Sequence, residues 1–167
     1  MYIELEKIQT MLDWLKSKLY LDSIAEKAKT RIVRRGEVYE CNFGIGIGSE
    51  MQKIRPCVII QGNVGNINSS NVIVAPITHT NKPLPCMAKL NPQSNNQGII
   101  LDGFVNLSNI QTISKARLGN FISRLSKEDI KEIDRALYVS VGVISNIKNY
   151  EKRIKNLENY IEKLKNQ

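Results

Sequence analysis

Short apolar runs separated by clusters of glycine, proline and asparagine fill the middle of the chain, and this feature constrains the fold most strongly. Tyr39, Cys41 and Phe43 alternate with other residues, as side chains on one face of a strand do. Strands are predicted at residues 37–43, 55–61, 71–78, 87–90, 98–101, 104–107 and 110–113. Nearby prolines make 87–90 an edge strand, and the turn-rich residues 62–70 are expected to be a loop. Many short strands with such turns are typical of a small antiparallel barrel.

Both ends of the chain instead have helical spacing. Five residues repeat at intervals of three and four near the N-terminus: Leu5, Ile8, Leu12, Leu15 and Leu19. They predict one amphipathic helix from about residue 3 into residues 25–29. Six residues repeat in the same way near the C-terminus, as three heptads: Ile147, Tyr150, Ile154, Leu157, Ile161 and Leu164.

The C-terminal heptad helix is too short to be secure alone, so it is expected to have a partner. The N-terminal stripe is the obvious candidate, within the chain or across a dimer. Packing on the chain's own barrel, or disorder until a partner binds, are the alternatives.

A third helix is expected to start at Ser126, because Ser126 to Asp129 resembles a capping box. Its apolar stripe should pack on the barrel: Ile130, Ile133, Leu137, Val141 and Ile144. Three parts follow: an N-terminal amphipathic helix at 1–30, a barrel domain at 31–145, and a C-terminal heptad helix at 146–167.

The formal net charge of +8 favours an anionic partner, nucleic acid first. No apolar stretch approaches the ~18 residues of a membrane helix, so we expect a cytoplasmic protein that does not contact a membrane. One histidine and three cysteines without metal-ligand spacing predict no metal site, and no cofactor is expected.

Arg55 and Thr78 are the candidates for chemistry, because they stand at the ends of two buried runs. Pro56 biases Arg55 towards an extended backbone, and a guanidinium fork suits a phosphate and its developing charge. The alternative is a surface arginine paired with Glu37 or Glu50. Thr78 alone carries little information, since threonine is common in strands.

Three further features could contact a ligand. The glycine-rich loop at 44–50 would allow close approach of a ligand backbone, although it lacks the lysine of a P-loop. His79, the only histidine, could move a proton or lie at the rim of the site. Asn109 and Gln111 should share a face of a short strand, where they could bond base edges or support a turn.

Taken together, the motifs resemble the MazF/PemK family of toxins. The resemblance covers about residues 33–143 and rests on three pieces in order: Arg35–Tyr39, Gly48–Ile60, and Val72–Thr78 with Ile110–Leu118.

The resemblance implies an SH3-like antiparallel barrel of the PemK/MazF/CcdB type with a C-terminal helix, and a homodimer. It also implies a metal-independent, sequence-specific endoribonuclease that leaves 2′,3′-cyclic phosphate and 5′-OH ends on single-stranded RNA. Arg55 and Thr78 would be catalytic, and a cognate antitoxin would be the protein partner. The RNA-binding residues would be Ser49, Lys53, Asn66, His79, Leu84, Ser108 and Asn109.

Some residues depart from the family pattern. Relatives often carry Glu-Gln-Ile-Arg where this chain has Ser108–Gln111, so the cleaved RNA sequence cannot be carried over. Both terminal helices extend beyond the family outline. A CcdB-like toxin that binds gyrase without cutting RNA, and an inactive RNA-binding scaffold, are the alternative functions.

Overall fold

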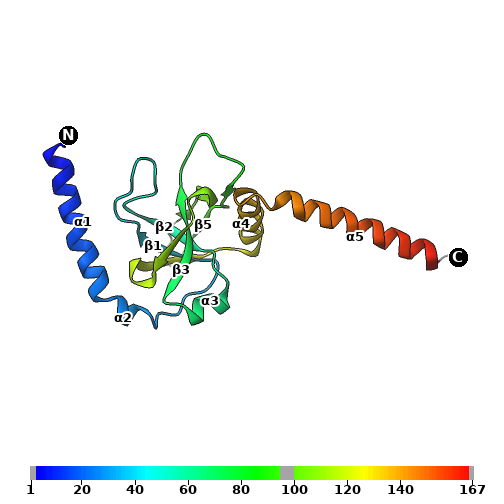
Figure 1. The fold of residues 1–167 in the computed structure, drawn as a ribbon, viewed down its shortest axis with the longest axis horizontal. Helices are drawn as coiled ribbons and strands as arrows, with labels where there is room; N and C mark the ends of the chain where they lie inside the picture. The colour runs from blue at the N-terminus through cyan, green and yellow to red at the C-terminus, as the bar shows by residue number, and fades with distance from the viewer. Residues whose placement is uncertain (1–2, 95–99, 166–167) are drawn as a thin grey trace.

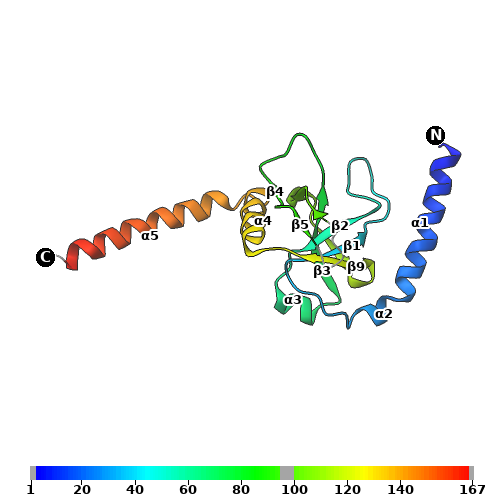
Figure 2. The ribbon, with the colours of Figure 1, turned by 180° about the vertical axis from the view of Figure 1, so that it is seen from behind.

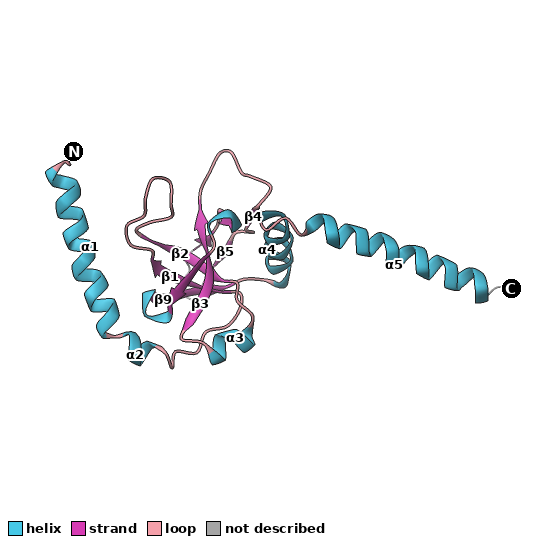
Figure 3. Ribbon diagram, viewed as in Figure 1, coloured by secondary structure: helices cyan, strands magenta, loops and turns pink. Residues whose placement is uncertain are grey.

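The computed structural model describes residues 3–94 and 100–165, and its centre is one antiparallel sheet flanked by helices (Figure 1, Figure 3). The order along the sheet is β4-β7-β3-β2-β1-β9, with β8 paired to β3. The strands are β1 Glu37–Asn42, β2 Ile54–Ile59, β3 Asn71–Thr78, β4 Met87–Lys89, β7 Phe104–Asn106, β8 Gln111–Ser114 and β9 Leu118–Arg124. The small antiparallel fold expected from the sequence is confirmed, as an open sheet that ends in β4 and β9.

The central strand β3 changes partners along its length. Its residues 71–74 pair with β8, residues 74–76 pair with β2, and the last two, Ile77 and Thr78, pair with β7. The pairing between β2 and β3 ends at Cys57 and Pro76. Beyond that point β2 continues against β1, where Arg55 pairs with Cys41. The two strands therefore separate at one end of the sheet, where Arg55 and Thr78 lie. We call this end of the sheet the Arg55–Thr78 edge.

Both faces of the sheet are buried, which explains the continuous apolar runs. One face packs against α4 (Lys127–Ser140), whose Ile133 and Ala136 are buried against Val38 and Val58. On the other face, Tyr39, Cys41 and Phe43 lie together in a second apolar cluster, as predicted.

The helix α4 begins as predicted. The Ser126 hydroxyl caps it by accepting a hydrogen bond from the Asp129 N–H at 3.0 Å. Ile130 and Leu137 pack on the core, but Val141 is the C-cap residue and is exposed. The predicted stripe is thus right for its first two turns and wrong at Val141 and at Ile144, which begins the next helix.

The terminal helices lie on opposite sides of the domain (Figure 1, Figure 2). The N-terminal segment is two helices, α1 Leu5–Ser23 and α2 Ala25–Ala28, which corrects the prediction of one continuous helix. The C-terminal helix α5, Ile144–Lys165, points away from the domain and has no buried residue. In this chain α5 packs neither on α1 nor on the sheet.

Three other local predictions need correction. Residues 62–70 contain a short helix, α3 Asn63–Asn68, where a loop was expected. The strand β9 was missed. Gln111 lies on β8, whereas Asn109 ends a 3₁₀ turn (η1, Leu107–Asn109), so the two do not share a strand face.

The run predicted at 98–101 lies partly outside the described residues. Its last two residues form β6, Ile100–Leu101, which pairs with β5, Gln93–Ser94. A second 3₁₀ turn, η2 Lys115–Arg117, joins β8 to β9. Among the described helices, none combines the length and apolarity that crossing a membrane requires.

Candidate active site

Arg55 and Thr78 stand at matching positions on neighbouring strands. Each lies two residues beyond the last β2–β3 pair, Cys57 with Pro76, counted along its own strand. At this point Arg55 is paired only with β1, and Thr78 only with Phe104 of β7. The strand register therefore places both residues at the same end of the β2–β3 pair.

The Arg55 guanidinium is oriented but not neutralised. Its Nε donates to the Gln52 carbonyl at 2.8 Å. Within the described residues no carboxylate lies within ion-pair distance of it, and the acids considered as partners are engaged elsewhere. Glu37 pairs with Arg124 at 2.6 Å, and Glu50 accepts from the Ile47 N–H at 2.8 Å. The four N–H groups of the two terminal nitrogens remain available to an anion.

Thr78 and its neighbours form the second half of the edge. Among the described residues, the Thr78 hydroxyl makes one long contact, 3.5 Å, to the His79 carbonyl, which leaves it able to bind a ligand. The His79 ring Nε2 lies 2.8 Å from an Asp102 carboxylate oxygen, and both side chains are exposed. Asp102 thus holds the ring at the rim, beside Thr78 in the chain.

Gly103 is required where the turn after β6 meets β3. Its φ is +102°, and a Cβ there would lie 2.8 Å from the Thr78 carbonyl oxygen. The sequence reasoning missed both Asp102 and Gly103. The Asp-Gly dipeptide is a turn signal that could have marked the turn, but nothing local ties it to His79, 23 residues away.

The β1–β2 loop stands beside Arg55. Lys53 closes it, since its N–H donates to the Gly44 carbonyl and its carbonyl accepts from the Phe43 N–H. Lys53 has φ +69°, which is rare for a residue other than glycine. The side chains of Ser49 and Lys53 are exposed, so both predicted RNA contacts are accessible.

The loop is also where α1 meets the domain. Trp14 lies directly over Gly44, where an added Cβ would be 2.3 Å from the ring carbon Cζ2. The Arg117 guanidinium sits 5.4 Å from the Trp14 ring centroid and donates to the carbonyls of Asn42 and Phe43. Residues of α1 and the loop also line a hollow of about 520 Å³.

Three of the predicted RNA-binding residues gather at another place. Leu84 precedes β4, and Ser108 and Asn109 belong to the turn after β7. The Leu107 N–H donates to the Cys86 carbonyl at 3.1 Å, which joins these two segments. Leu84 and Ser108 are exposed. This group lies several residues along β7 from the Phe104–Thr78 pair.

Asn66 is not brought to this edge. It lies on α3, which connects the opposite ends of β2 and β3 (Figure 1), and its side chain is 1% exposed. Its side-chain amide nitrogen donates to the Gln61 backbone carbonyl, and its backbone carbonyl accepts from the Lys115 ammonium at 2.8 Å. Burial lowers the pKa of Lys115. This geometry favours a structural role for Asn66.

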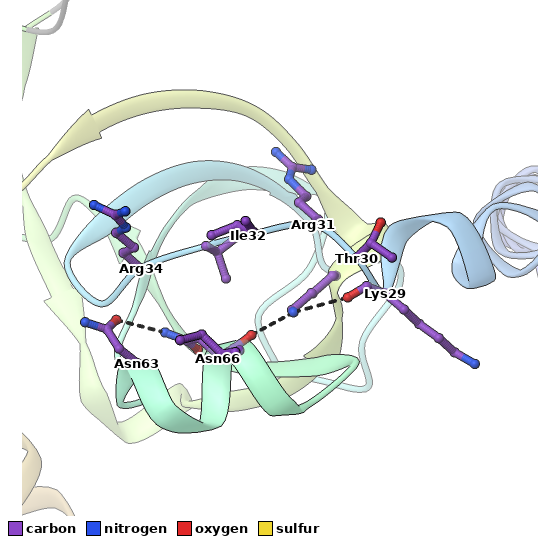
Figure 4. A pocket seen from close by; sticks show the side chains of 10 residues that line it. Lys29, Thr30, Arg31, Ile32, Arg34, Asn63 and Asn66 are labelled. Carbon is purple, nitrogen blue, oxygen red and sulfur yellow. Dashed lines mark hydrogen bonds between the residues drawn. The ribbon is translucent and has the colours of Figure 1, made fainter.

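A hollow of about 450 Å³ adjoins Asn66 and is lined by residues of α3 and the segment before β1 (Figure 4). Lys29, Arg31 and Arg34 stand around it. It lies by α3, not by the Arg55–Thr78 edge, so it is not the candidate active site.

The cysteines do not take part in the candidate site. Cys41 and Cys57 are buried in the core, and all three cysteines are free. The contact with the Cys41 thiol, followed by burial, raises the pKa of Cys57 well above its usual value. A buried, protonated thiol is a poor nucleophile, so the position of Cys57 suits a structural role.

The fold and this edge define a small domain built on an antiparallel sheet, with an arginine and a threonine where its two central strands separate. The family model for the PemK-like, MazF-like toxin of type II toxin–antitoxin systems matches residues 34–141. Endoribonuclease EndoA of Bacillus subtilis (strain 168) is 34% identical over 113 residues, covering 68% of this chain and 97% of the relative. The chain therefore belongs to the PemK-like, MazF-like toxin family, as its motifs indicated.

Solved structures extend the likeness. An endoribonuclease from a mycobacterial species, in complex with its cognate antitoxin, is 27% identical with a TM-score of 0.56, covering 66% of this chain and 96% of that one. MazF from Deinococcus radiodurans is 17% identical with a TM-score of 0.58, covering 67% and 98%, and shows the shared fold. The terminal helices α1 and α5 lie outside the family match.

Proposed function

We propose that this protein is a toxin endoribonuclease that cuts single-stranded RNA at specific sequences without a metal ion. One observation supports the proposal: among the described residues, a guanidinium without a carboxylate partner and a hydroxyl with one long contact belong to residues two positions beyond the last β2–β3 pair. The similarity to EndoA over nearly the whole length of that relative supports ribonuclease activity.

The reaction uses the RNA's own nucleophile. The ribose 2′-oxygen attacks the adjacent phosphorus and loses its proton, a 2′-O–P bond forms, and the P–O5′ bond breaks. The leaving O5′ takes up a proton, so the products end in a 2′,3′-cyclic phosphate and a 5′-OH. Arg55 stabilises the negative charge that develops on the phosphoryl oxygens. The Thr78 hydroxyl orients the phosphate or the 2′-OH.

At this edge the RNA would pass between the β1–β2 loop and the loop that follows β3. Ser49 and Lys53 contact its backbone, because both are exposed beside Arg55. His79, oriented by Asp102, lines the rim. Leu84, Ser108 and Asn109 would receive bases further along.

The protein partner would be a cognate antitoxin whose acidic segment covers the same cationic edge. An antitoxin is present in the structure of the mycobacterial relative. We further propose a homodimer acting in the cytoplasm, where its RNA substrates are made.

The test is incubation of the purified protein with a long single-stranded RNA in EDTA, beside Arg55→Ala and Arg153→Ala. Arg153 is a matched control because it lies on α5, outside the family match. We expect discrete cuts by the wild type and by Arg153→Ala, and a loss of at least about 100-fold in rate for Arg55→Ala. No cutting by the wild type across varied RNAs would favour a gyrase-type binder or an inactive scaffold.

A further inference from the structure

The heptad face of α5 is exposed although it has the composition of a buried seam. Tyr150, Ile154, Leu157, Ile161 and Leu164 are each between 50 and 66% exposed. Near its start α5 comes close to α4, where Ile144 and Ile147 line a hollow together with Tyr138. A row of large apolar side chains on a 22-residue helix is unfavourable in water unless another surface covers it.

The order of residues along this face of α5 indicates which kind of helix pairing would cover it. With Ile147 as the first a position, the a residues are Ile147, Ile154 and Ile161, and the d residues are Tyr150, Leu157 and Leu164. Among parallel coiled coils, isoleucine at a with leucine at d favours two strands. The α1 helix of the same chain cannot supply the second strand in this arrangement, since it lies on the opposite side of the domain (Figure 1).

The flanking charges select the orientation. In a parallel pair, the residue before an a position faces the residue after the next d position of the other helix. Arg153 would then face Glu158 of the second copy, twice by symmetry. In a fully overlapped antiparallel pair, Glu151 would face Glu158, and these like charges repel.

We propose that α5 pairs in parallel with α5 of a second copy of this chain, forming a two-stranded coiled coil outside the toxin domain. The linkage to α4 suits this role. Gly142, at φ +75°, ends α4 with its N–H donating to the Val139 carbonyl, and Val143 donates to the Tyr138 carbonyl. This capped turn fixes the direction in which α5 leaves the domain. The proposal does not depend on nuclease activity.

Disulfide trapping tests it, because trapping responds to α5 pairing whether or not the toxin domains also dimerise. The full chain carries Cys86→Ser, since Cys86 is the one cysteine that is not buried. Ile147→Cys is then oxidised mildly and compared with Asn149→Cys, which lies on the outer side of the same turn. We expect a covalent dimer for Ile147→Cys and at least about a tenfold lower yield for Asn149→Cys, the factor that 1.4 kcal/mol represents.

Mixing two variants tests the orientation. In an antiparallel pair, Ile147→Cys would link to Leu164→Cys and not to itself. That result would overturn the parallel arrangement, and equal trapping of Ile147→Cys and Asn149→Cys would overturn the coiled coil itself.

A charge exchange supplies an independent readout. Arg153→Glu in the Ile147→Cys chain should lower the trapped yield, since it places a second carboxylate against Glu158 in both symmetric contacts. Adding Glu158→Arg should restore it, because the pair is then reversed but still complementary. Failure of the second change to restore trapping, with helicity unchanged by circular dichroism, would contradict the parallel pairing of these residues.

Discussion

Arg55 shows how a buried strand can present a charge. Pro56 keeps its backbone extended, its Nε donates to the Gln52 carbonyl, and the residue lies where β2 leaves β3. Strand-end position and residue type made Arg55 a candidate, but only the family motifs singled it out together with Thr78, because a threonine at the end of a strand is common. The place of Asn66 could not be predicted, because sequence order does not say which end of the sheet a connecting segment covers.

Lys53 offers a direct measure of backbone contact with RNA. Lys53→Gln, made in an Arg55→Ala chain so that the RNA stays intact, keeps the β-carbon and removes the charge. The plot of log affinity against log salt concentration should become shallower by about 0.7 if one phosphate contact is lost. Lys155→Gln, on the exposed face of α5, should leave the slope unchanged. An unchanged slope for Lys53→Gln would remove Lys53 from the RNA path.

Tyr39 makes the stability of the fold depend on pH in the alkaline range. Burial, and then the hydrogen bond to Glu37 at 2.9 Å, raise the pKa of Tyr39 to about 12 from 10.0. The pKa of Tyr39 is higher in the folded state than in the unfolded state. The phenol therefore contributes fully to the free energy of unfolding below pH 10, and this contribution is lost as the pH rises towards 12.

Tyr39→Phe isolates this effect. Urea unfolding at pH 8 to 11 should give a wild-type advantage over Tyr39→Phe of about 1–2 kcal/mol at pH 8, from the hydrogen bond to the carboxylate. The advantage should shrink above pH 10. Lys115 acts in the opposite direction in both proteins, since burial lowers its pKa, and it cancels in the comparison. An advantage that is constant to pH 11 would contradict the assigned role of Tyr39.

The helices and strands differ in how well the sequence predicted them. The strand β3 and the start of α4 were predicted closely, because apolar runs and a capping serine are local signals. The strand β9 was missed because Gly119 and Asn120 look like a turn, whereas long-range pairing with β1 and its register shifts make them part of a strand. The break at Ile24 between α1 and α2 could not be predicted, because no glycine or proline marks it.

The docking of α1 through Trp14 predicts a strong coupling with Gly44. Gly44→Ala should destabilise the chain by about 1–2 kcal/mol from its positive φ alone, and further because the new Cβ meets the Trp14 ring. In the Trp14→Ala background the steric part should disappear, so the two changes should be non-additive by more than about 0.5 kcal/mol. Additive effects in urea unfolding would show that α1 is not docked there.

At the scale of the whole molecule, the chain is a family toxin domain with helical extensions of different kinds at its two ends. One lies against the β1–β2 loop beside the proposed active site, and the other points away with its apolar face open. Heptad periodicity predicted both helices but left their partners open, because periodicity describes a face and not what covers it. The spatial separation of α1 and α5 required the fold.

The central claim is that the RNA's own 2′-OH is the nucleophile at the Arg55–Thr78 edge. The most direct measurement compares two oligonucleotides that contain a mapped cleavage site. They are identical except that one lacks the 2′-OH on the nucleotide just before the cut. We predict that the all-ribose strand yields a 2′,3′-cyclic phosphate, seen by mass spectrometry, and that the 2′-deoxy strand binds but is not cut. Cleavage of both strands at equal rates would mean that another nucleophile attacks the phosphorus.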